Sequence, residues 1–489
     1  MLAQFARVRK VAFYANARLN LARGFDDASV TDLRHSRNLP KLALARRRDH
    51  RIRQEFRFHL LAPASAIVMW ICLWCNLNSG FWNIVPPSNL DEWQLAIRAI
   101  LPFGVLPVAF FFLVIRKKVI LPWSGPSRLL MVYGCFAAIG TFFSPEPGWS
   151  LYWTMNFLAT ILVAWNFLDR KDPVGSARQL LQVTWAATFV VAAIIGYQAQ
   201  GSIFGHGSSA YGLVEQDIHG LSRSSGIARW AAIPGLVCLV KAYHSRRIIY
   251  FPFYLGIAGV AFFIVYRMQS RGAVFGSIAA LLFTLVVGSR LRRYALPFAI
   301  IAMLVIFILD SPAAWSNKFD EYIRRGQSKE EFRTMTGRTH VYEDGMAAFA
   351  DAPIFGRGQW ADRLVINQHV HNSFLQAMLN SGVTGAVPYF LSWGAGWLIF
   401  FRLQKRRLRL NPEDRICVLE AGTVMMFFTV RAIPETTTAS YAVDLLVMVA
   451  VYVYLETLLL ISSRRRRSER SPVFLPASSQ AAQQLRQAS

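Results

Sequence analysis

The chain has 489 residues, of which 54% are hydrophobic and only 17% are charged. This composition leaves too little polar surface for a soluble domain of that length, so it excludes an ordinary water-soluble enzyme and indicates a membrane protein. The formal net charge of +25 does not call for nucleic acid, because basic residues anchor the cytoplasmic side of membrane proteins against anionic lipids.

The first predicted region, residues 1–58, is a basic cytoplasmic arm. It contains Arg46-Arg47-Arg48 but no apolar run beside a small-residue cleavage site, so we do not expect a cleaved signal peptide. Apolar runs of roughly 17 to 22 residues follow, each long enough to cross a hydrocarbon core about 30 Å thick. We predict about twelve spans: residues 59–79, 98–115, 129–143, 150–168, 179–197, 229–243, 249–266, 272–288, 294–309, 383–401, 416–432 and 442–461.

The predicted domains follow from these spans. Residues 59–309 hold the first nine spans, residues 310–382 form a long external loop, and residues 383–461 hold the last three. Residues 462–489 form a basic and then disordered cytoplasmic tail. The span at 129–143 is short and ends at Ser144-Pro145-Glu146-Pro147, so a tilted or re-entrant segment remains an alternative there.

Basic clusters test this topology, because short cytoplasmic loops are rich in Lys and Arg. They occur in every second connection, which places both termini in the cytoplasm and the 310–382 loop on the opposite face. The clusters are Arg116-Lys117-Lys118, Arg170-Lys171, Arg246-Arg247, Arg290 with Arg292-Arg293, Lys405-Arg406-Arg407 and Arg464 to Arg467.

Several arginines fall on the predicted outer face, against this trend. A guanidinium is a permanent charge with a planar fork of donors, so several at one depth suit a lipid diphosphate headgroup. Arg271 is the first candidate because it opens a predicted helix beside Gly272, and Arg223 is the second. Snorkelling, or pairing with acids such as Glu435, is the alternative. The other outer-face arginines are Arg229, Arg267, Arg338, Arg357 and Arg431.

His371 is the candidate for proton transfer. It precedes Asn372-Ser373, a polar pair typical of a helix start, and a neutral imidazole there could accept a proton near pH 7. A solvated or structural histidine is the alternative, and His369 and His340 are rivals. No metal site is predicted, since Cys72 and Cys75 lie inside an apolar span without a second pair.

These motifs carry a family resemblance. The ordered set Arg223-x-x-Gly226, Ser270-Arg271-Gly272, Gly337-Arg338, Pro353-x-x-Gly356-x-Gly358 and His371-Asn372-Ser373-Phe374-Leu375 resembles the bacterial O-antigen ligase and polymerase family, over about residues 200 to 440. One departure is Ile227-Ala228-Arg229-Trp230, where relatives often have an aromatic residue and a Pro-Asn pair. Arg229 could therefore replace or assist Arg223.

The resemblance implies a GT-C-type membrane glycosyltransferase that needs no metal, nucleotide sugar or other cofactor. Such an enzyme moves an oligosaccharide or polysaccharide from undecaprenyl diphosphate to an acceptor hydroxyl, on the periplasmic side of the bacterial inner membrane. Arg271, Arg223, Arg338 and Arg229 would then bind the diphosphate, and His371 would be the base. Gly337, Gly356, Gly358 and Asn372 would support the motifs.

The resemblance leaves the acceptor open. A surface polysaccharide polymerase, for O-antigen or exopolysaccharide, would elongate another carrier-linked glycan, whereas a ligase would use lipid A core. Polysaccharide export or chain-length proteins are possible partners besides membrane lipids. Two alternatives of other kinds are a lipid-linked sugar flippase or secondary transporter, and a metal-dependent enzyme using Asp91-Glu92.

Overall fold

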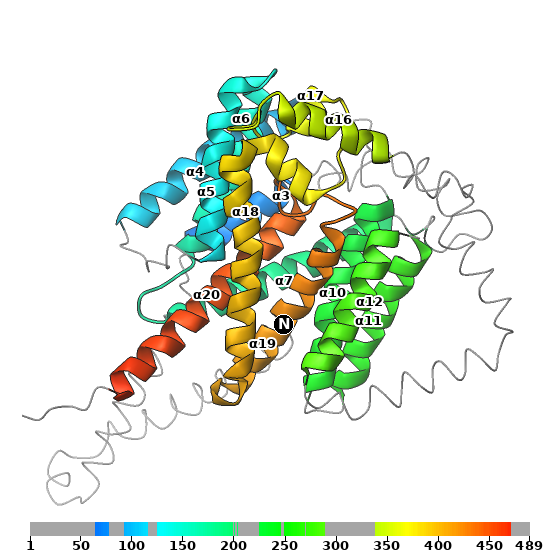
Figure 1. Cartoon of the computed structure of the whole chain (residues 1–489). Coiled ribbons are helices and arrows are strands. Elements are labelled where there is room, and N and C mark those ends of the chain that lie inside the picture. Colours follow the sequence, from blue (N-terminus) through cyan, green and yellow to red (C-terminus); the bar gives the residue numbers. More distant parts are fainter. Residues whose placement is uncertain are drawn as a thin grey trace, which may run out of the picture. The chain divides into compact units, whose positions relative to one another are not determined.

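The computed structural model describes residues 64–77, 92–115, 125–198, 200, 203, 224–245, 249–268, 270–288 and 338–470. The chain divides into two compact units, Met1–Leu61 and Ala62–Ser489, and all described residues belong to the second. Every regular element in the described ranges is a helix (Figure 1). The fold of this part of the chain is therefore all-α, as the sequence predicts.

Every predicted span except 294–309, which lies outside the described residues, coincides with a helix. The α-helices are α3 (Ala64–Cys75), α4 (Glu92–Ile115), α5 (Pro126–Gly140), α6 (Pro147–Asn166), α7 (Pro173–Gln198), α10 (Ser224–His244), α11 (Tyr250–Arg267), α12 (Arg271–Val287), α16 (Arg338–Ala350), α17 (Ala361–Val365), α18 (Ser373–Lys405), α19 (Pro412–Arg431) and α20 (Val443–Arg470). Two 3₁₀ turns, η4 (Thr141–Phe143) and η5 (Arg407–Arg409), complete the described set.

Six of the described helices are long and apolar enough to cross a membrane. They identify a polytopic membrane protein, while the total of about twelve spans stays a prediction. The six segments are Pro126–Phe143, Pro173–Tyr197, Ser225–His244, Tyr250–Arg267, Ser373–Lys405 and Val443–Ser463. The first contains the short predicted span at 129–143, which continues from α5 into η4.

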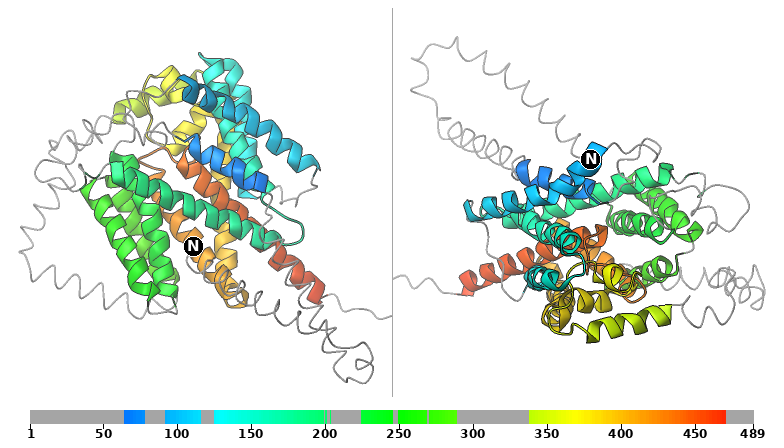
Figure 2. Two further views of the ribbon diagram at one scale, coloured as in Figure 1. Left: turned by 180° about the vertical axis from the view of Figure 1, so that it is seen from behind. Right: turned by 90° about the horizontal axis from the view of Figure 1, so that it is seen from above.

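The helices differ in how much of their apolar surface they bury. In α20, 78% of the most apolar window is buried inside the protein, compared with 17% in α11. Phe251, Val260 and Phe263 of α11 are exposed, which suits a helix that faces lipid. The central position of α20 among the other helices is clear in two further views (Figure 2). The window of α10 is buried to the same 78%, so the packing core of the bundle contains both α10 and α20.

The ends of five helices meet at one end of the bundle. The first residues of α10, α12, α18 and α20 lie there with the last residues of α19, as the contacts described below establish. At the opposite end, Arg178 near the start of α7 pairs with Glu413 in the first turn of α19, 2.6 Å apart. The basic residues Arg170-Lys171 and Lys405-Arg406-Arg407 flank the helix ends on that opposite side.

Helix α18 begins ten residues before the predicted span at 383–401, because it is two helical segments joined at a kink. Gly382 at the kink has φ 59° and ψ −165°, a backbone conformation suited to glycine. The first segment contains Gln376, Asn380 and Ser381, which are polar but buried. Hydropathy therefore detects the second segment and misses the first.

Candidate active site

The His371-Asn372-Ser373 motif forms the start of α18. Asn372 is the N-cap, and its side-chain oxygen accepts hydrogen bonds from the backbone N–H groups of Phe374 and Leu375 at 2.9 and 3.0 Å. The Tyr342 hydroxyl of α16 donates to the His371 carbonyl oxygen at 3.4 Å. His371 itself has φ 46°, in the left-handed region. The cap and the α16 contact thus hold a histidine that precedes the helix in an uncommon conformation.

The segment between α19 and α20 is joined to this helix start. The Ser373 backbone N–H donates to the Ala432 carbonyl oxygen at 3.0 Å, and the Ser373 hydroxyl donates to the Glu435 carbonyl oxygen at 3.0 Å. The Asn372 side-chain amide donates to the Ile433 carbonyl oxygen at 3.1 Å. These bonds fix the two segments against each other, although they are about sixty residues apart in sequence.

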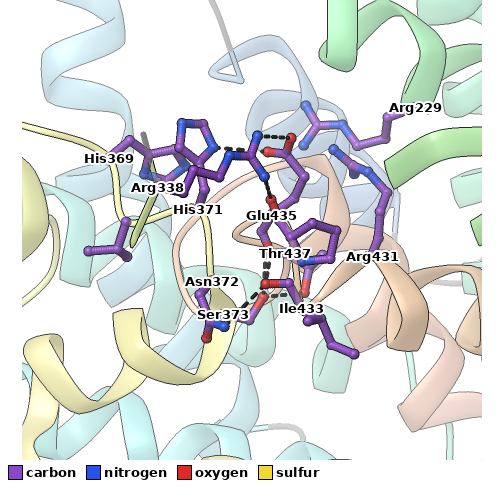
Figure 3. Close-up of polar contacts among 12 residues, drawn as sticks. Arg229, Arg338, His369, His371, Asn372, Ser373, Arg431, Ile433, Glu435 and Thr437 are labelled. Atoms are coloured by element: carbon purple, nitrogen blue, oxygen red, sulfur yellow. Dashed lines mark hydrogen bonds and ion pairs between the residues drawn. The ribbon is translucent and has the colours of Figure 1, made fainter. Parts of the chain in front are cut away.

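The side chains of His371, Glu435 and Arg338 converge in this space (Figure 3). His371 Nδ1 lies 3.2 Å from Glu435 Oε2, and an Arg338 Nη atom lies 3.4 Å from Glu435 Oε1. A second Nη of Arg338 donates to the Pro434 carbonyl oxygen at 2.5 Å. The side chains of His371 and Arg338 are 23% and 28% exposed, so both can be reached by a ligand.

The environment sets the charge of each group. Burial disfavours ionisation of Glu435, but the hydrogen bond from His371 and the charges of Arg431 and Arg338 outweigh it and lower its pKa to about 2. Burial also lowers the pKa of His371, and its contact with Glu435 offsets only part of that effect. Near neutral pH we therefore expect an ionised Glu435 beside a neutral imidazole. Nδ1–H then donates to Glu435, and Nε2 carries the lone pair.

A buried ion cluster lies next to Glu435. Asp444 at the start of α20 is fully buried, and its carboxylate oxygens lie 3.2 Å from an Arg229 Nη and 3.3 Å from an Arg431 Nη. Two guanidinium groups thus share one carboxylate, which leaves an excess of positive charge. Figure 3 shows Arg229 and Arg431 on the side of Glu435 away from His371.

The arginines predicted to bind phosphate lie at different places relative to His371. Arg271 is the first residue of α12, and the next residue packs on the α19–α20 segment: a Cβ added to Gly272 would lie 3.5 Å from Cγ of both Pro434 and Glu435. Arg271 therefore begins its helix beside the residues that contact His371 and Arg338. Arg229 is paired with Asp444. Arg223 and Gly337 lie outside the described residues.

Gly356 and Gly358 lie against the kink in α18. Their φ angles are 67° and 81°, and a Cβ added to Gly356 would lie 2.5 Å from the backbone nitrogens of Ser381 and Gly382. The Gly358 N–H donates to the Asn380 carbonyl oxygen at 2.9 Å. The Pro353-to-Gly358 motif thus occupies the break in α18 and bonds backbone groups that the kink leaves free.

Two site features were missed from sequence. Glu435 was considered only as a pairing acid, and its contact with His371 depends on bringing together segments 64 residues apart. Its position directly after Pro434, at the end of a predicted span, was the available signal. Asp362, which bonds His369, carries no local sequence signal that would select it.

A comparison with known protein families supports the importance of the residues that meet at this site. The family described as O-Antigen ligase matches residues 256–390, a range that contains Arg271, Arg338, the glycine motif and His371. The predicted resemblance to the O-antigen ligase and polymerase family is thereby confirmed. No curated protein matches the chain.

Proposed function

We propose that this member of the O-antigen ligase and polymerase family is a GT-C-type glycosyltransferase that moves a glycan from undecaprenyl diphosphate to an acceptor hydroxyl. The observation that carries the proposal is the contact of His371 with Glu435, beside Arg338 and the start of α12. It combines a histidine able to accept a proton with arginines able to bind phosphate. Those are the two functions that this transfer requires.

In the proposed reaction, His371 Nε2 accepts the proton of the acceptor hydroxyl. The hydroxyl oxygen attacks the anomeric carbon of the donor sugar, and the bond from that carbon to the diphosphate oxygen breaks. Glu435 accepts the Nδ1–H hydrogen bond and stabilises the imidazolium that forms. The carrier diphosphate leaves with the bonding electron pair.

Negative charge grows on the diphosphate as the bond breaks. Arg271 at the start of α12, Arg338, and the excess positive charge of the Arg229–Asp444–Arg431 cluster support the proposal that this charge is stabilised by arginine. We propose that Arg223, outside the described residues, assists Arg271. Because arginines supply the positive charge, we propose that the reaction requires neither metal nor cofactor.

We propose that the site faces the periplasm at the bacterial inner membrane. The basic residues Arg170-Lys171 and Lys405-Arg406-Arg407, typical of the cytoplasmic face, flank helix ends opposite the site. Because α18, α19 and α20 run between the two ends, the site and these clusters face opposite sides of the bilayer. We propose that both termini are cytoplasmic, as the predicted even number of spans implies.

Polymerisation of a surface polysaccharide is the proposed activity, and ligation to lipid A core is the alternative that the same donor site allows. Purified protein in proteoliposomes would be given an undecaprenyl-diphosphate oligosaccharide with either a second carrier-linked glycan or lipid A core. Elongated carrier-linked glycan is the expected product. Product on lipid A core alone would overturn polymerisation and leave glycosyl transfer intact.

The same preparation tests the two other classes. Flux of a labelled carrier-linked sugar across the membrane without formation of a glycosidic bond would indicate a flippase or transporter. Loss of transfer on chelation and its recovery with Mg²⁺ or Mn²⁺ would favour the metal-dependent alternative at Asp91-Glu92, of which Glu92 begins α4. We expect full transfer in the presence of chelator.

A further inference from the structure

A second histidine–carboxylate pair lies directly beside the first. His369 Nδ1 is 2.7 Å from Asp362 Oδ2, and the His369 and His371 rings meet edge to face with centroids 4.5 Å apart and planes at 61°. Both imidazoles use Nδ1 to bond a carboxylate, Asp362 for one and Glu435 for the other. Figure 3 shows the two rings together above the start of α18.

Asp362 is held in place from the core of the protein. Its side chain is 3% exposed, and its other oxygen accepts a hydrogen bond from the Gln376 amide at 3.0 Å. The same Gln376 amide nitrogen donates to Asn380 at 2.9 Å, and Asn380 in turn donates to the Tyr133 hydroxyl at 3.0 Å. This chain of buried bonds links Asp362 to α5 and α18, so the carboxylate cannot turn away from His369 without breaking them.

The two carboxylates differ in the groups that share their charge. Glu435 faces Arg338 and Arg431 as well as His371. The hydrogen bonds to Asp362 come from His369, the Gln376 amide and the Val370 backbone N–H at 3.4 Å, and the charge of Arg363 also acts on Asp362. Positive charge on one ring opposes protonation of the other, because two adjacent imidazolium rings would repel each other.

We propose that His369, oriented by Asp362, is a positioning residue for His371: across the ring contact it opposes protonation of His371 and so keeps that imidazole ready to accept a proton. This inference rests on the proposed function, in which His371 is the base. In this inference, His369 acts on His371 through the contact between their two rings. The charge on His369 is among the causes that lower the pKa of His371.

Other charged groups around His371 also favour or disfavour its protonation. Glu435 from the α19–α20 segment favours the protonated form of His371, whereas Arg338 from α16 disfavours it. Tyr342 of α16 bonds only the His371 carbonyl oxygen. Loss of the His369 charge should therefore make His371 easier to protonate, and loss of the Glu435 charge should make it harder.

The test is the pH profile of glycosyl transfer by full-length protein in proteoliposomes. Transfer needs neutral His371, so the rate falls as pH falls through its pKa, which defines the acid limb. We expect His369→Gln and Asp362→Asn each to move this limb upward by roughly half to one pH unit, the size expected for one charge at about this separation in a polar site. Transfer at high pH should recover to within about threefold of wild type.

The matched control is His340→Gln. His340 forms the same kind of pair, with Nδ1 2.8 Å from Asp344 Oδ2, but its side chain is 75% exposed on α16. We expect its acid limb to coincide with that of the wild type. An unmoved or downward-moved limb in His369→Gln would overturn the inference, and it can be measured even where Asp362→Asn does not fold. Absence of transfer by the wild type would instead contradict the proposed function.

Discussion

Both ends of the helical bundle contain buried carboxylates, but the carboxylates at the two ends form hydrogen bonds with different groups. At the end that carries the proposed site, Glu435 and Asp362 each contact a histidine that is partly exposed. At the opposite end, Glu456 accepts bonds from the Ser127 backbone N–H and hydroxyl, at 2.5 and 2.8 Å. Ser127 lies in the first turn of α5, so the Glu456 carboxylate acts as a helix cap supplied by another helix.

A buried acid therefore does not by itself identify a functional site. Asp414 at the opposite end bonds Arg178 at 2.7 Å and the Tyr454 hydroxyl at 3.0 Å, and neither partner exchanges protons near neutral pH. Glu435 contacts His371, the residue proposed to accept a proton. A partly exposed titratable partner therefore distinguishes the two ends, and substitutions at each end should have different effects.

The largest effect is expected for His371→Ala. Removal of the base should lower glycosyl transfer by about 100-fold or more, because general base catalysis typically contributes that much. The protein should still insert and fold, since the cap of α18 is formed by Asn372 rather than by the histidine. Transfer per folded protein, measured in proteoliposomes beside His340→Gln, tests this. Turnover within a few-fold of wild type would remove His371 as the base.

Glu435→Gln should have the next largest effect, a loss of about tenfold at neutral pH. The amide can still accept the Nδ1–H bond but cannot stabilise the imidazolium by charge. Because Glu435 favours protonation of His371, its loss lowers the pKa of His371, and the acid limb should move to lower pH. This direction is opposite to that expected for His369→Gln. Glu343→Gln, at an exposed position on α16, is the control.

Arg271→Ala should act mainly on use of the donor. Loss of one guanidinium from a phosphate site typically costs about 1.5–3 kcal/mol, so we expect roughly tenfold or greater weakening in kcat/KM for the carrier-linked donor. The acceptor KM should change little. Arg409→Ala, exposed at the opposite end, provides a control of equal charge change. An unchanged donor dependence in Arg271→Ala would place the diphosphate elsewhere.

The smallest effect on turnover is expected at the opposite end. Glu456→Gln removes the carboxyl group that caps α5, so the free energy of unfolding should fall by about 1–2 kcal/mol. Transfer per folded molecule should match that of the wild type, since none of the site residues that the structure describes contacts Glu456. Thermal unfolding in detergent, paired with the transfer assay, separates the two quantities. A selective loss of transfer without loss of stability would contradict the comparison.

Hydropathy predicted the helices well because membrane spans need long apolar runs, and charge placement predicted which helix ends lie together. The start of α18 was missed because Gln376 and Asn380 are buried polar residues whose partners lie in other segments. For the same reason, His371, Arg271 and Arg338 could be selected from local motifs, whereas Glu435 could not. Pairing between segments distant in sequence is a tertiary property, and local patterns do not encode it.

In the proposed reaction, His371 removes a proton from the acceptor while a carrier diphosphate leaves. Its most direct test is a single-turnover reaction of purified wild-type and His371→Gln proteins with an undecaprenyl-diphosphate oligosaccharide and a carrier-linked acceptor. We expect the wild type to release one carrier diphosphate for each glycosidic bond formed, and the variant to bind donor with similar affinity but form almost no bond. Bond formation by the variant at a rate near that of the wild type would contradict it.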